Sequence, residues 1–183
     1  MSEIIAYKAG NETYAVTTVT PLPISSQAYS AAVTLTRTAD TNAYAANDVL
    51  GAATGSTAAL TFASMGADAG RVNISSISIE IDIAAVPASM AGMRLHLYNV
   101  TPPSALGDNT AWDLPAGDRA SYLGFVDFGT PVDLGSTLYV EANGVDKQVK
   151  LAGTSLFGYL VTAAGYTPAS ATVHVLTVHT KGV

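Results

Sequence analysis

The amino-acid sequence predicts an all-β protein: an antiparallel β-sandwich of about eight strands with a jelly-roll-like topology and an extended N-terminal arm. Short runs alternate apolar with polar residues, which is the period of a half-buried strand. β-branched and aromatic residues concentrate in these runs, and Gly- and Pro-containing turns separate them. No segment shows a convincing amphipathic-helix period. An immunoglobulin-like sandwich also fits this pattern, although the Cys–Trp–Cys hallmark of antibody domains is absent.

The first thirty residues lack a sustained period. Pro21 and Pro23 bracket Leu22, and proline favours an extended backbone. We therefore divide the chain into an N-terminal arm, residues 1–30, and a β-sandwich domain, residues 31–183. The arm is too apolar for a solvated tail, so we expect it to lie on another subunit or a partner, or to fold back on its own domain. Its candidate partner-binding residues are Ile4, Ile5, Tyr7, Tyr14, Leu22 and Ile24.

The sandwich strands follow in order along the chain. In the clearest run, Ile77, Ile79, Ile81 and Ile83 share one face, whereas Val72 and Ile74 have the opposite parity. A β-bulge at Ser75-Ser76 is the simplest cause of this phase change. The expected strands cover residues 31–37, 60–63, 72–83, 93–98, 122–128, 137–142, 149–151, 156–162 and 172–179, the last of which we expect to be buried on both faces.

The long loop from Tyr98 to Pro115 holds the only tryptophan, Trp112. Long loops in compact domains often carry binding, and tryptophan is favoured in interfaces, so Trp112 is a further candidate partner-binding residue. Alternatively, Trp112 anchors the loop onto its own sandwich.

Composition excludes several classes. The chain has 183 residues and no cysteine, so it is neither a disulfide scaffold nor a thiolate metal site. With 49% hydrophobic and 12% charged residues it lacks the composition of a disordered protein. The net charge is −6 and the basic residues are scattered, so we expect neither nucleic acid nor a membrane as partner. The N-terminus lacks the pattern of a signal peptide.

No motif predicts catalysis, a cofactor or a metal. The histidines His96, His174 and His179 lie in expected strands without ligand spacing, and no GxSxG nucleophile motif occurs. Glu80 and Asp82 share one strand face, which we expect to be solvated or to meet Arg94. A glycan hydrolase would need paired carboxylates facing each other across a cleft. The clustered carboxylates, which loop solvation and capping explain, are Asp108, Asp113, Asp118, Asp127 and Asp133.

Several segments resemble small structural proteins of tailed bacteriophages. They are residues 32–51 (AVTLTRTADTNAYAANDVLG), 95–104 (LHLYNVTPPS), 120–129 (ASYLGFVDFG) and 132–135 (VDLG). The resemblance implies a non-enzymatic capsid decoration, or cement, protein that binds the major capsid protein. Such proteins commonly sit as trimers over junctions between capsid subunits. It also implies synthesis in the host cytoplasm and a final location on the capsid surface of the virion.

The alternative function is a receptor- or glycan-binding module of a phage tail fibre or baseplate. In that case Trp112, Tyr98 and Tyr166 would stack on sugar rings, and Asp and Asn side chains would bind hydroxyls.

Overall fold

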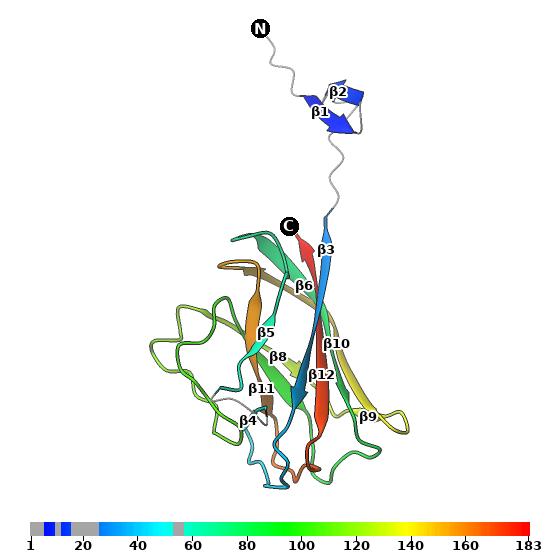
Figure 1. Ribbon diagram of the computed structural model, residues 1–183, viewed down its shortest axis with the longest axis vertical. Helices are drawn as coiled ribbons and strands as arrows, with labels where there is room; N and C mark the ends of the chain where they lie inside the picture. Colours follow the sequence, from blue (N-terminus) through cyan, green and yellow to red (C-terminus); the bar gives the residue numbers. More distant parts are fainter. Residues whose placement is uncertain (1–5, 10–11, 16–25, 53–56) are drawn as a thin grey trace.

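A computed structural model describes residues 6–9, 12–15, 26–52 and 57–183, and the side chains from residue 26 onward. No helix in these ranges is long and apolar enough to span a membrane. The described residues form β-strands joined by turns and loops (Figure 1). The strands are β1 (Ala6–Ala9), β2 (Glu12–Ala15), β3 (Ala28–Thr36), β4 (Val49–Leu50), β5 (Leu60–Phe62), β6 (Arg71–Ile81), β7 (Met93–Tyr98), β8 (Tyr122–Phe128), β9 (Val132–Asp133), β10 (Leu138–Lys150), β11 (Leu156–Thr162) and β12 (Val173–Gly182).

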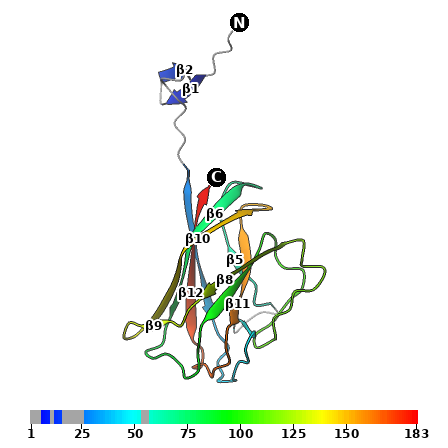
Figure 2. The same cartoon turned by 180° about the vertical axis from the view of Figure 1, so that it is seen from behind.

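Two antiparallel five-stranded sheets form the sandwich. The first sheet has the order β3-β12-β6-β10-β9, and the second has the order β4-β11-β7-β8, with β5 also paired to β11. The sheets lie face to face, with β3 beside β5 at one margin and β8 beside β10 at the other (Figures 1 and 2). β1 and β2 pair antiparallel as a separate two-stranded sheet.

The strand order confirms the predicted jelly roll. β4 and β5 both pair with β11 and together serve as one interrupted strand, and β9 is a short addition at the sheet margin. The remaining order places the first, eighth, third and sixth principal strands in one sheet, and the second, seventh, fourth and fifth in the other. This alternation between sheets is the wrapped double Greek key of a jelly roll.

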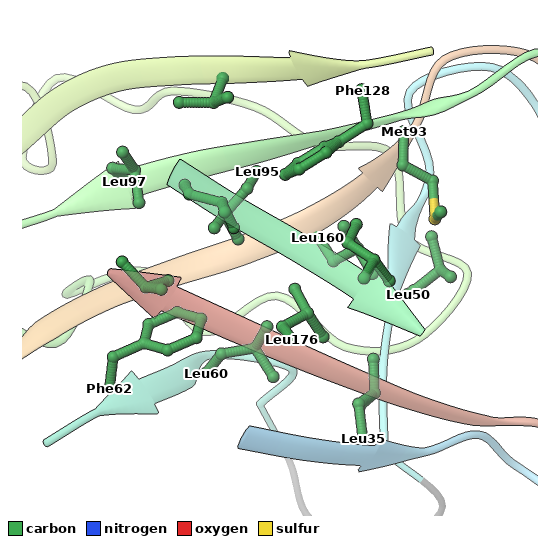
Figure 3. Close-up of a cluster of buried hydrophobic side chains, with 14 of the residues drawn as sticks. Leu35, Leu50, Leu60, Phe62, Met93, Leu95, Leu97, Phe128, Leu160 and Leu176 are labelled. Carbon is green, nitrogen blue, oxygen red and sulfur yellow. The ribbon is translucent and has the colours of Figure 1, made fainter. Parts of the chain in front are cut away.

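The core lies between the sheets and is built from alternate residues of each strand. β7 contributes Met93, Leu95 and Leu97, all fully buried. Figure 3 shows side chains from both sheets meeting there. The predicted inward faces are confirmed for the isoleucine-rich strand, where the buried residues are Val72, Ile74, Ile77, Ile79 and Ile81.

The predicted β-bulge is present in β6. His179 of β12 pairs with Ser76, and the next residue, Thr180, pairs with Ile74, so Ser75 is left out of the ladder. The extra residue changes the phase of alternation, and isoleucine side chains on both sides of it therefore point inward.

Other expectations about the strands need correction. The strands expected at 137–142 and 149–151 are the two ends of one strand, β10, which runs from Leu138 to Lys150. Positive φ at Gly144 and Asp146 lets the chain bulge there without leaving the sheet. The last strand is fully buried on one face only: His174, Leu176 and Val178 point inward, while the opposite face has no second layer of described residues over it. β3 begins three residues earlier than expected, and the sequence did not predict β4, β9 or the β1–β2 pair.

Leu95→Ala should lower the free energy of unfolding by about 3 kcal/mol, because it leaves a cavity between the sheets. Chemical denaturation measures this. The matched control is Leu134→Ala at a side chain that is 65% exposed, which should change stability by less than about 0.5 kcal/mol. Equal effects of the two substitutions would contradict the assignment of the core.

Candidate functional site

The arm residues lie largely outside the described part of the chain. Ile4, Ile5, Leu22 and Ile24 are not described, and neither are the side chains of Tyr7 and Tyr14. The backbone places Tyr7 opposite Tyr14 in the β1–β2 pair. Their partner-binding role therefore stays a prediction. The expected arm boundary at residue 30 falls inside β3, whose first residues, Ala28–Ser30, pair with β12.

The outward face of the second sheet is rich in aromatic side chains. His96 and Tyr98 of β7 lie on it, beside Tyr159 of β11 and Tyr122 and Phe125 of β8. The segment between β7 and β8 lies over this face, away from the first sheet (Figure 2). His96 and Tyr98 are consequently buried, although their parity in the strand is that of outward-facing residues. A second apolar cluster forms there, separate from the sandwich core.

Trp112 fixes this covering segment to the sheet. Its ring stacks on His96, with centroids 3.7 Å apart and planes 27° apart. Tyr122 contacts the same histidine through its hydroxyl, 3.0 Å from Nδ1. Trp112 is half-buried in this position. The geometry favours the anchoring interpretation of Trp112, and its contact with a partner stays a prediction.

Two buried polar side chains hold the rest of the segment. Asp118 accepts hydrogen bonds from the backbone N–H and the hydroxyl of Ser104, at 3.2 and 3.1 Å. The Tyr159 hydroxyl donates to the Ser104 carbonyl at 2.8 Å. Because both ends of the segment are bonded, the loop is a fixed layer of the fold. Among the described residues, this loop forms a third layer over the second sheet.

A buried polar cluster closes the sandwich where β3 ends. Arg37 is 1% exposed, and its guanidinium donates to the Tyr44 hydroxyl, to the Ala169 carbonyl at 3.1 Å and to Asp40 at 3.4 Å. The Tyr44 hydroxyl in turn donates to Asp108 at 2.6 Å.

Asp108 joins this cluster to other segments. It accepts from the backbone N–H of Gly51 at 2.8 Å and lies 3.8 Å from Arg37. Burial, and then the Asp108 carboxylate, raises the pKa of Tyr44 well above its usual value, so this hydroxyl keeps its proton. Sequence patterns gave no signal for this cluster, because its members lie up to 132 residues apart.

The histidines do not form a common site. His174 points into the core and His179 points out, which confirms that they lie on opposite faces. Burial, and then the nearby Arg37, lowers the pKa of His174 to about 4. Burial, and then Arg94, lowers the pKa of His96 to about 4. Both side chains are neutral at physiological pH.

The carboxylates are also dispersed. Arg94 pairs with Asp127 of β8 at 2.7 Å in the second sheet, so the expected contact of Arg94 with Glu80 and Asp82 in the first sheet is wrong. Glu80 and Asp82 are exposed, which agrees with the solvated alternative. Within residues 26–52 and 57–183, no three metal-ligating side chains converge.

No family model and no curated protein matches the chain. Among solved structures, one of Desmodium yellow mottle tymovirus aligns at 15% identity and a TM-score of 0.27, over 88% of this chain and 90% of that chain. A structure of full particles of Israeli acute paralysis virus heated to 63 degrees aligns at 11% identity and a TM-score of 0.30, over 98% of this chain and 90% of that chain. A structure of the native virion of Kashmir bee virus at acidic pH aligns at 13% identity and a TM-score of 0.28, over 98% of this chain and 89% of that chain. TM-scores this low do not establish a shared fold or function.

Stability should fall as the pH is lowered from about 6.5 to about 4. In this interval His174 is protonated in the unfolded chain but stays neutral in the folded protein. Because the unfolded state binds this extra proton, lowering the pH favours unfolding. The difference between the two pKa values corresponds to about 3 kcal/mol at the acidic end. His174→Phe should flatten the slope of the free energy of unfolding against pH, measured by denaturation at several pH values. An unchanged slope would contradict the buried neutral state.

Proposed function

We propose that the chain is a non-enzymatic structural protein of a tailed-phage virion, which binds the outer surface of the capsid and stabilises the shell. The resemblance of residues 32–51, 95–104, 120–129 and 132–135 to phage structural proteins motivates this proposal. The jelly-roll topology supports it, because this architecture recurs in virion proteins, although a fold alone does not determine function.

The observation that carries the proposal is that polar side chains which could act in catalysis instead hold the fold together. His96, Asp108 and Asp118 are engaged in contacts that hold loops onto the sandwich. In contrast, the surface leaves large apolar side chains in solvent, with Val132 60% and Phe125 47% exposed. A partner that covered these side chains would release water from apolar atoms, which favours association.

A decoration protein needs no chemistry. If it binds the expanded shell and not the precursor, mass action lowers the free energy of the expanded state, by an amount that grows with the logarithm of its free concentration relative to Kd. Several contacts made by one oligomer add avidity, and the resemblance implies a trimer for this purpose. The partner in this proposal is the major capsid protein, and the location is the capsid surface.

The arm is the proposed attachment element. It leads directly into β3, and among the described residues β3 pairs only with β12 and therefore forms a margin of the first sheet. A chain that enters at a sheet margin can extend onto a neighbouring molecule and add a strand to an exposed sheet edge there.

Glycan binding is not supported by the described side chains. Tyr98 is fully buried and Tyr166 is 6% exposed, so neither ring face is open to a sugar. Trp112 stacks on His96 with one face. We therefore propose no carbohydrate ligand.

Purified protein mixed with expanded, undecorated capsids should bind saturably, as counted by electron microscopy and co-sedimentation. Deleting residues 2–24 should abolish binding, because the arm supplies the attachment. The control is the full chain with Arg119→Ala, an exposed change on the loop over the second sheet that keeps the arm. Circular dichroism should show that all variants remain folded. Undiminished binding by the folded deletion variant would exclude the arm, and no binding by the full chain would overturn the proposed function.

A further inference from the structure

The outward face of the first sheet, here called the outer face, separates its charges by sign. The basic residues lie at the end of the sheet where β12 terminates. Arg71 of β6 is directly opposite Lys150 of β10, and Lys181 of β12 is opposite Asn73. All three cations are exposed. The same end holds one carboxylate, Asp146, which accepts a hydrogen bond from the Asn73 amide at 2.5 Å, so its net charge is positive.

The acidic residues lie at the other end of the same face. Glu80 pairs with Val175 and Tyr139, and Glu141 pairs with Ser78, two residues along β6. Asp82 follows Glu80 by two residues and points the same way, and its backbone N–H donates to Val173. These three carboxylates are exposed. With Asp146 the face carries four carboxylates and three cations, and its two ends have opposite net charge.

The bulge at Ser75 creates this arrangement. Arg71 and Glu80 are separated by an odd number of positions, so a regular strand would place them on opposite faces. The extra residue restores a common face. Arg71 and Glu80 are then about 30 Å apart at the rise of a strand, which is too far for them to pair within one copy.

The charges have no partners in the described part of the molecule. Its ion pairs involve Arg37 and Arg94 only. Arg71 and Lys150 are like charges directly across a ladder, an arrangement that destabilises an isolated sheet. A negative surface placed over them would relieve this repulsion.

Between the charged ends, the face carries small side chains on β3, β12 and β6. Ala32, Thr177 and Ser78 occupy one row, which ends at Glu141 of β10. At the acidic end, exposed Val132 lies opposite Tyr139 and extends the face with apolar surface. Small and β-branched side chains let a second sheet approach at the spacing of about 10 Å seen in sandwiches.

We infer that the occupant of the outer face is a second copy of this chain, packed sheet against sheet with its strands running in the opposite direction. A two-fold axis in the plane of the contact and across the strands brings each basic end over the acidic end of the other copy. An axis along the strands would superpose like charges. The dipolar face is therefore self-complementary in one orientation, as an isologous interface requires.

The face is large enough for a specific contact. Four strands, each about 4.8 Å wide, over about ten residues at about 3.3 Å each, give about 600 Å² per copy. This is the lower end of the range for specific interfaces, so the dimer should be reversible and sensitive to salt. The inference goes beyond the proposed function, and it requires an even number of copies, whereas the resemblance implies three.

The test is a charge exchange between full-length chains. One variant carries Glu80→Lys with Asp82→Lys, and the other carries Arg71→Glu with Lys181→Glu. All four side chains are exposed, so both variants should fold. Native mass spectrometry and sedimentation at low salt should find the parent chain dimeric and each variant monomeric, because like charges now meet. An equimolar mixture should form the heterodimer. Arg119→Glu, an exposed change on the loop over the other sheet, is the matched control and should stay dimeric.

Each outcome decides the inference separately from capsid binding. A monomeric or trimeric parent chain, or variants that dimerise like the parent, would overturn the two-fold contact. If the parent is monomeric and only capsid binding is lost in the variants, the face binds the capsid and not a second copy. A parent dimer that binds no capsid would retain this inference and refute the proposed function.

Discussion

The structure depends on one constraint: alternate side chains of each strand must be buried between two sheets, and this parity also decides what faces outward. Ile77, Ile79 and Ile81 of β6 point into the core, so Glu80 must point out. At Ser75 the strand inserts one residue, which keeps Ile74 inside. A change that serves the core thereby also sets the positions of charges on the outer face.

The two sheets differ in whether a described segment covers their outward faces. On the second sheet, the segment carrying Trp112 covers the aromatic side chains and forms a third layer. On the first sheet no described segment does so, and the face retains its separated charges. This difference explains why we place the proposed contact between copies on the first sheet and treat Trp112 mainly as an anchor. If the arm attaches the protein to the capsid, the outer face of the first sheet stays free to contact a second copy.

Sequence patterns predicted what is local. Alternation located β6, β7 and β11, and the mismatch between Ile74 and Ile77 revealed the bulge, because parity within a strand needs no knowledge of neighbours. Burial of His96 was not predictable, because it results from a loop that returns over the strand. The cluster of Arg37 and Asp108 was also missed, because contacts between distant segments are set by topology. The apolar residues of the arm indicated that it contacts another surface, but the sequence does not identify that surface.

The most direct test of the parity constraint compares two single-residue deletions in β6. Deleting Ser75 removes the residue that is left out of the ladder, so every inward side chain should stay inward and a cooperative unfolding transition should remain. Deleting Ser78 removes a paired residue and turns half of the strand over, so cooperative unfolding should be lost. Equal stability of the two variants in denaturant titrations would contradict the account.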